Sequence, residues 1–259
     1  MSFYDTVARF YDAENADKTD DIDFYLELAE ETDGSILDVG CGSGRVVLPL
    51  ARAGHKVAGV DNNKPMLERA QARVRQQPDA YPHLSLEQAD VLQPGALAGQ
   101  TFDLVLLTYN LLMHFHQQAE QLTLLRNMRQ LTSPDGLLII DLPNAGETFA
   151  TPDSDELSLE RTFIDPQTGH MVMQQAVSTL DRATQTMRVL WVYDEITGDG
   201  TVKRTVAPKL FRYFFPYEVQ LLLGMSGYTL QQTYGDYDGS PFQDGSPRML
   251  MLAAPSDAE

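Results

Sequence analysis

The stretch from Ile36 to Gly44 constrains most strongly what this chain can fold into, because it joins a short apolar run to a glycine-rich loop. The run delivers Asp38, and glycines follow at the alternate positions 40, 42 and 44. Glycine allows a sharp turn and lets a ligand lie against bare backbone. A dinucleotide fingerprint has the spacing Gly-x-Gly-x-x-Gly, but Arg45 and Val47 occupy the positions where its third glycine would stand. The glycine-rich loop can therefore be interpreted as a generic turn or as a different kind of nucleotide site.

Two further acids follow the next two predicted strands. Residues 56–60 read as a buried parallel strand that ends at Asp61, about 20 residues beyond the glycine loop, where an acid can accept hydrogen bonds from both ribose hydroxyls. The alternative role for Asp61 is to cap a helix over residues 65–77. Residues 83–89 alternate like a third strand and lead to Asp90. Acids at three successive strand ends are a pattern that chance rarely supplies.

Later segments indicate a parallel sheet that helices cover on both faces. Residues 102–107 are almost continuously apolar, and residues 137–141 form a similar run. A helix capped by Ser43 is predicted to run to about Ala53, with Pro49 kinking it, and another helix is predicted over residues 117–131.

Taken together, the predicted strands, helices and strand-end acids of residues 35–142 resemble the small-molecule type of class I S-adenosylmethionine-dependent methyltransferases. The resemblance rests on Asp-x-Gly-x-Gly-x-Gly after the first strand and on the acids after the second and third strands. It implies an α/β, Rossmann-like seven-stranded sheet in the order 3-2-1-4-5-7-6, with S-adenosyl-L-methionine as cofactor. It also implies that Asp90 accepts a hydrogen bond from the adenine amine. The residues assigned to the cofactor are Asp38, Gly40, Cys41, Gly42, Gly44, Asp61, Asn62, Met66, Asp90, Val91 and Thr108.

The composition and charge of the chain exclude some classes of binding partner. The chain has 259 residues and a formal charge of −18, which disfavours nucleic acid and suits a small or cationic substrate. The tetrad at residues 108–111 also departs from the signature of enzymes that methylate exocyclic amines of DNA bases. The lone Cys41 excludes an internal disulfide and reads as a small buried filler rather than a reactive thiol, and no Cys/His cluster predicts a metal. Without a run of 18 apolar residues or a signal-peptide pattern, we expect a cytoplasmic protein with no membrane partner.

The segments on either side of this core predict a helical cap and a lid. Residues 2–15 form an amphipathic helix with Tyr4 and Tyr11 on one face, similar to the segment that folds over the substrate mouth in small-molecule methyltransferases; core packing is the alternative for both tyrosines. From residue 155 to 215 the hydrophobic period becomes two, which predicts an antiparallel insertion over the site.

We therefore expect one methyltransferase domain, residues 1–259, made of four parts. These are a helical cap (1–33), a cofactor-binding core (34–150), a β-rich substrate lid (155–215), and a helix with an edge hairpin of the core sheet (216–254). An unpaired strand edge in the lid makes a homodimer an expectation.

The catalytic candidates follow from where ligands bind in such sheets, beyond the carboxyl ends of the strands where the strand order reverses. Of the five histidines, only His114 and His116 follow the fourth strand, and His114 is the candidate general base, with a helix-cap role as its alternative. Arg212, at the lid exit, could bind a substrate carboxylate or phosphate, or pair with a surface acid. We expect Tyr11, Tyr109, Asn110, His114 and Arg212 to converge around the methyl group.

The resulting hypothesis is methyl transfer to a nitrogen or an oxygen of a small-molecule acceptor, in the manner of sugar-amine and glycine N-methyltransferases. One rival is a cofactor-binding homologue without transferase activity. Another is an aminopropyltransferase, but such enzymes carry paired acids after the fourth strand, and residues 108–116 contain none.

Overall fold

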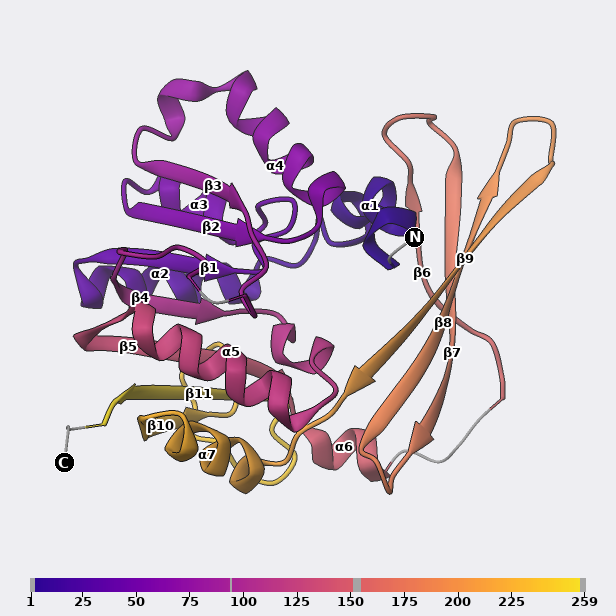
Figure 1. Ribbon diagram of the computed structural model, residues 1–259. Coiled ribbons are helices and arrows are strands. Elements are labelled where there is room, and N and C mark those ends of the chain that lie inside the picture. The colour runs from indigo at the N-terminus through magenta and orange to yellow at the C-terminus, as the bar shows by residue number, and fades with distance from the viewer. Residues whose placement is uncertain (1–2, 94, 151–154, 257–259) are drawn as a thin grey trace.

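A seven-stranded sheet forms the core of the computed structural model, which describes residues 3–93, 95–150 and 155–256. The strand order β10-β11-β5-β4-β1-β2-β3 confirms the predicted order, because β10 and β11 are the sixth and seventh strands of this sheet along the chain (Figure 1). The strands are β1 (Ser35–Val39), β2 (Lys56–Asp61), β3 (Leu84–Gln88), β4 (Phe102–Leu107), β5 (Thr132–Pro143), β10 (Tyr228–Tyr234) and β11 (Arg248–Pro255).

The point where the strand order reverses lies between β1 and β4. Strand β1 pairs in parallel with both β2 and β4, and β4 pairs in parallel with β5. Strand β11 runs antiparallel to β5 and to β10, which confirms the predicted edge hairpin. The carboxyl ends of β1, β2, β3 and β4 therefore meet at one edge of the sheet, beside the point where the order turns back.

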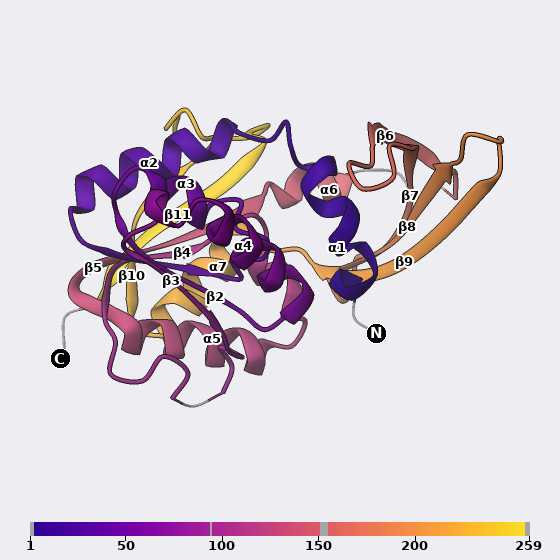
Figure 2. The same ribbon diagram turned by 90° about the horizontal axis from the view of Figure 1, so that it is seen from above.

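Helices cover both faces of this sheet (Figure 2). Apolar side chains of α2 (Asp20–Thr32), α3 (Val47–Arg52) and α4 (Lys64–Gln76) pack against one face, and those of α5 (Gln118–Leu131) and α7 (Pro216–Met225) pack against the other. Short 3-10 turns, η1 (Pro78–Ala80) and η2 (Leu111–His114), precede β3 and α5. In the part of the chain that the structure describes, no helix combines the length and apolarity needed to span a membrane.

Two predictions about the helix after the glycine loop are wrong. Helix α3 begins only at Val47, and the Ser43 hydroxyl donates to Asp12 at 2.6 Å instead of capping the helix. Pro49 is the third residue of α3. A first-turn residue has no intrahelical acceptor for its N–H, so proline there removes no hydrogen bond and causes no kink.

The predicted insertion is a separate antiparallel sheet, which we call the lid sheet. It consists of β6 (Ser158–Ile164), β7 (Met171–Asp181), β8 (Thr186–Ile196) and β9 (Val202–Arg212), in chain order. A short helix that the sequence pattern did not indicate, α6 (Ala145–Ala150), lies between β5 and the lid sheet. Figure 1 shows the lid sheet standing beyond the carboxyl ends of the central strands.

Helix α1 (Phe3–Glu14), predicted over residues 2–15, lies between the two sheets (Figure 1). On its lid side, Phe10 stacks on Tyr193 with ring centroids 4.7 Å apart. On its core side, Asp12 pairs with Arg69 at 2.6 Å and with Arg73 at 2.9 Å, both on α4. Helix α1 therefore covers the space above the carboxyl edge of the central sheet.

Candidate active site

A cavity of about 640 Å³ lies at the carboxyl edge of the sheet, lined by the ends of β1, β2 and β4, by α1 and by one residue of β9. The structure brings most of the predicted site residues together there. These are Tyr11, Asp38, Gly40, Cys41, Gly42, Asp61, Asn62, Met66, Asp90, Val91, Thr108, Tyr109 and His114.

The glycine loop forms the floor of the cavity. Gly40 has a φ of +69°, a backbone conformation that favours glycine, and a Cβ built there would lie 2.6 Å from Cδ1 of Leu111. Gly42 has a φ of +56° and donates its N–H to Oδ2 of Asp61 at 2.8 Å. Gly44 does not line the cavity, since it packs against Leu48 of α3 and serves the turn.

Cys41 fills space beneath this loop. Its Sγ would lie 2.9 Å from a Cβ built at Gly59, so the thiol occupies the room that the strand glycine leaves. Burial raises the pKa of the Cys41 thiol far above its ordinary value, which keeps it protonated and unreactive. The structure favours the filler role over the reactive thiol.

Asp38 is a buried carboxyl group with one oxygen left unpaired. Its Oδ1 accepts from the Thr108 hydroxyl at 3.4 Å, whereas Oδ2 is buried without a hydrogen-bond partner among the described residues. Burial raises the pKa of Asp38 to about 7, and the nearby Arg45 guanidinium opposes that rise. An unpaired buried acceptor is costly, and a cationic donor from a ligand would satisfy it.

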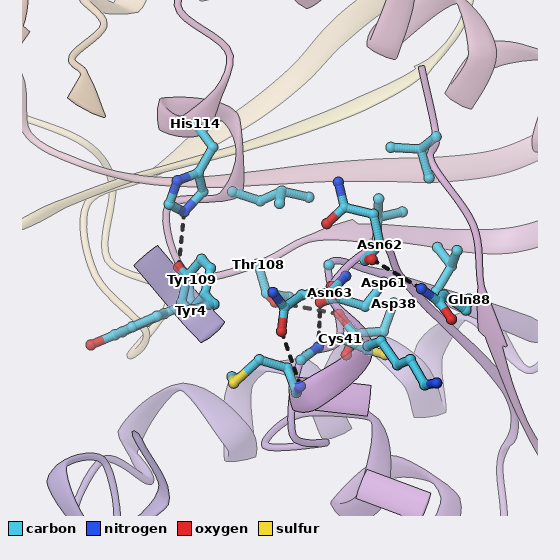
Figure 3. A pocket seen from close by; sticks show the side chains of 18 of the residues that line it. Tyr4, Asp38, Cys41, Asp61, Asn62, Asn63, Gln88, Thr108, Tyr109 and His114 are labelled. Carbon is cyan, nitrogen blue, oxygen red and sulfur yellow. Dashed lines mark hydrogen bonds between the residues drawn. The ribbon is translucent and has the colours of Figure 1, made fainter. Parts of the chain in front are cut away.

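Asp61 holds the loop and the start of α4 together. Its Oδ1 accepts from the backbone N–H of Asn63 at 2.7 Å, and its Oδ2 accepts from Gly42 (Figure 3). The alternative cap role is wrong, because Asn63 is the N-cap of α4 and accepts from Met66 N–H at 3.0 Å. Burial raises the pKa of Asp61, and the hydrogen bonds from the backbone N–H groups of Asn63 and Gly42 oppose that rise.

Asp90 and Val91 stand at the next strand end along the same edge. Oδ1 of Asp90 accepts from the Leu92 N–H at 3.0 Å, which fixes the carboxylate at the cavity wall. Three acids thus line one side of the cavity, each at the end of a different parallel strand.

His114 and Tyr4 form a hydrogen-bonded pair at the other end of the cavity. Nε2 of His114 lies 3.1 Å from the Tyr4 hydroxyl oxygen, and Nδ1 is buried without a partner among the described residues (Figure 3). Burial lowers the pKa of His114 to about 3, with Lys209 and His116 adding to the effect, so the imidazole is neutral near pH 7. The cap alternative is wrong, because Gln117 and Glu120 form the capping box of α5.

Tyr11 and Tyr109 line the cavity in different ways. Burial raises the pKa of Tyr11, which therefore stays a phenol. Tyr109 has a φ of +47°, and its ring lies 4.4 Å beneath the Arg45 guanidinium, while its hydroxyl contacts the Lys18 ammonium. Tyr109 is thus held as a wall of the cavity.

Three candidates lie outside the cavity. Asn110 accepts from Arg248 at 2.8 Å, and Nε2 of His116 donates to the Leu210 carbonyl at 2.9 Å. Arg212 pairs with Glu218 and donates to the Thr184 carbonyl, so the structure shows the salt-bridge alternative. The predicted convergence is wrong for Arg212 and for Asn110. Alternation along a strand explains the position of Arg212, since Lys209 and Phe211 of β9 share the face toward His114 and Arg212 takes the other.

The predicted site residues did not include Tyr4, Arg45 or Lys209, which line the cavity, although the sequence placed Tyr4 on the same helix face as Tyr11. The seven-residue spacing from Tyr4 to Tyr11 could have revealed Tyr4, because both lie on one helix face. Arg45 directly follows the glycine loop and forms two 2.7 Å hydrogen bonds with the Asp21 carboxylate. Nothing in the pattern around Lys209 distinguishes it from other lysines of the lid sheet.

The strand order and the match to solved structures identify the class I methyltransferase fold. Residues 36–136 match the family model described as the methyltransferase domain.

Relatives and solved structures agree with this assignment. The cypemycin N-terminal methyltransferase of a Streptomyces species is 25% identical over 218 residues, covering 84% of this chain and 82% of that protein. The structure of the CcbJ methyltransferase from Streptomyces caelestis matches with a TM-score of 0.80 at 20% identity, over 99% of this chain and 98% of that one. The sugar N-methyltransferase KedS8 from Streptoalloteichus sp ATCC 53650 matches with a TM-score of 0.74 at 19% identity, over 96% and 92%. At these identities the two structures establish the fold alone.

The unpaired oxygen of Asp38 predicts a pH-dependent cofactor affinity. Because the pKa of Asp38 is about 7, a fall in pH protonates it, and pairing with the cofactor's ammonium weakens by up to about tenfold per pH unit below that value. Asp38→Asn should bind S-adenosylhomocysteine more weakly at pH 8 and lose this pH dependence. Calorimetry at pH 6, 7 and 8 measures both.

Thermal unfolding supplies the control for Asp38→Asn. The native pKa lies above the ordinary value of an aspartate, so the stability that Asp38 contributes is present at low pH and lost as pH rises through about 7. Asp38→Asn should therefore be at least as stable as the unsubstituted protein at pH 8. Unchanged affinity in a folded variant would remove Asp38 from the cofactor site.

Asp61→Ala should weaken S-adenosylhomocysteine binding by about 1.5–3 kcal/mol, because two ribose hydroxyls lose a charged acceptor. Glu87→Ala is the control, since Glu87 is an exposed acid of the neighbouring strand β3 that does not line the cavity. Equal affinities of the two variants in calorimetry would contradict the ribose role.

Proposed function

We propose that this chain transfers the methyl group of S-adenosylmethionine to a nitrogen of a small-molecule acceptor, with oxygen as the alternative nucleophile. The observation that carries the proposal is a single cavity with two chemically different ends. One end presents the glycine loop and three strand-end acids, and the other presents the neutral His114–Tyr4 pair. Nitrogen is placed first because KedS8 is named a sugar N-methyltransferase and the cypemycin enzyme is named an N-terminal methyltransferase.

The residues at the first end fit the cofactor by their donor and acceptor chemistry. Asp38 offers a buried, unpaired carboxylate oxygen to an ammonium group, and Asp61 offers a carboxylate at the rim to hydroxyl groups. Glycines 40 and 42 leave bare backbone along the loop. When bound, the cofactor supplies an electrophilic methyl group on a sulfonium.

The other end of the cavity has to align the nucleophile and exclude water, and such positioning can supply about 7–11 kcal/mol of the barrier reduction. The Tyr4 phenol stays protonated because burial raises its pKa well above 10.0, so its oxygen remains a neutral hydrogen-bonding group. His114 is neutral and can hold a proton at Nε2 or Nδ1.

A weak base suffices for this reaction. Positive charge develops on a nitrogen as it gains a methyl group, so its N–H proton becomes acidic only as the bond forms. His114, with a pKa of about 3 in the free protein, therefore accepts a hydrogen bond first and takes the proton late. This refines the general-base hypothesis, because orientation comes before proton transfer.

The rivals can be separated by simple measurements. An aminopropyltransferase would hold a polyamine with acids after β4, and the segment from Thr108 to His116 has none. A binding protein without activity would release no S-adenosylhomocysteine with any acceptor. Homodimer formation and a cytoplasmic location stay predictions.

The acceptor is to be found by screening small amines and alcohols for release of S-adenosylhomocysteine. With an acceptor in hand, His114→Ala should lower kcat by ~10²–10⁴ and leave cofactor affinity nearly unchanged, because the pair acts on the nucleophile. His83→Ala is the control, since His83 is exposed at the opposite edge of the sheet. Full activity of His114→Ala from pH 6 to 9 would make His114 structural.

A further inference from the structure

Lys209 is the one residue that the lid sheet contributes to the cavity among the described residues. Its ammonium lies over three aromatic rings, 5.4 Å from the ring centroid of Tyr4, 5.9 Å from that of Phe3 and 5.9 Å from that of Phe211. The stem is half-buried on β9, so the charge is held inside the cavity rather than in open solvent. This ring of aromatic side chains and the ammonium it surrounds form a defined subsite.

This ammonium has no carboxylate partner among the described residues. The cavity's other lysine and its arginine both have acid partners: Arg45 pairs with Asp21 at 2.7 Å, and Lys64 pairs with Glu68 at 3.8 Å. Lys209 stays unpaired although acids outnumber bases by 37 to 19 in the chain. Burial alone lowers its pKa, and no acid contributes to offset that effect.

Among the residues that the structure describes, the acids that line the cavity form no salt bridge with Lys209. Asp38, Asp61 and Asp90 stand at the cofactor end, and Asp5 at the rim accepts from the Asn63 side chain at 2.8 Å. A desolvated ammonium retains its attraction for anions, since aromatic faces replace only part of its hydration. The subsite is therefore suited to a negatively charged group brought in from outside.

We propose that Lys209 binds an anionic group of the methyl acceptor, so that the acceptor is a small amine that also carries a carboxylate or a phosphate. This inference rests on the proposed function, because it assigns the acceptor end of the same cavity. The anion would lie close to the reacting nitrogen, since Tyr4 and Phe211, whose rings Lys209 covers, both contact the His114 imidazole, at 5.7 Å and 5.3 Å between centroids.

Ion pairing at Lys209 has a consequence for His114. The positive charge of Lys209 is one cause of the lowered pKa of His114. An anion bound to Lys209 offsets that charge and makes the imidazole a better proton acceptor. An anionic acceptor thereby makes His114 a stronger base toward the acceptor's own proton. An uncharged amine of the same shape does not have this effect.

An equilibrium experiment tests the subsite without a known acceptor. Protein saturated with S-adenosylhomocysteine is titrated calorimetrically with inorganic phosphate and with acetate, which also distinguishes the two anion sources. Lys209→Met keeps the apolar stem and should weaken binding by about tenfold or more, whereas Lys209→Arg keeps the charge and should stay within about threefold. Lys203→Met, an exposed lysine on the same strand, is the matched control and should behave like the unsubstituted protein.

Turnover then tests the acceptor class with matched pairs, glycine against glycinamide and phosphoethanolamine against ethanolamine. Lys209→Met should raise KM for the anionic member by about tenfold and leave the neutral member unchanged. Anion binding that is equal in Lys209→Met and the unsubstituted protein, or absent from both, would overturn the inference while cofactor binding still stands. If S-adenosylhomocysteine fails to bind, the proposed function fails. Titration of the free protein with the same anions then still tests whether Lys209 binds an anion.

Discussion

Helix α1 makes the site possible because its two sides bind two different parts of the molecule. Phe10 stacks on Tyr193 of the lid sheet, and Asp12 binds Arg69, Arg73 and the Ser43 hydroxyl of the core. An aromatic pair of this kind adds about 0.5–1.5 kcal/mol beyond its buried area. The contacts couple the lid sheet to the glycine loop, so Tyr4 and Lys209 reach the same cavity as Asp38 although they come from distant parts of the chain.

The cavity also shows a conflict between stability and function. Burial raises the pKa of Asp38 to about 7, and within the described part of the chain Oδ2 has no hydrogen-bond partner, which costs free energy in the unliganded fold. The same features favour a cationic ligand at that point. Lys209 presents the opposite case at the other end, where a half-buried ammonium has no carboxylate partner among the residues that the structure describes. The two uncompensated charges give the cavity a polarity, with a cation expected at one end and an anion at the other.

Much of the fold could be predicted from the sequence, because periodicity and strand-end residues report local constraints. The acids at 38, 61 and 90 mark strand ends that do lie along one edge, and the change to a period of two after Asn144 marks the lid sheet. Details that depend on an element's first residue were less predictable. Ser43 binds Asp12 from another helix, so α3 starts later than a local cap would place it.

The acceptor end could not be predicted because it depends on contacts between distant segments. The pKa of His114 is set by burial and by Lys209, which lies on β9 of the lid sheet. Whether Lys209 or Arg212 enters the cavity depends on the parity of β9 relative to the core, and a strand pattern without its partner does not define that parity. Tyr4 becomes part of the site only because α1 docks with that face toward η2.

The central claim is that the glycine loop and the three strand-end acids form a site for S-adenosylmethionine and for no dinucleotide. Calorimetric titration of the unsubstituted protein with S-adenosylhomocysteine, and separately with NAD, tests that claim most directly. The structure predicts saturable one-to-one binding of S-adenosylhomocysteine and no heat of binding with NAD. Binding of NAD, or no binding of S-adenosylhomocysteine to the folded protein, would contradict it.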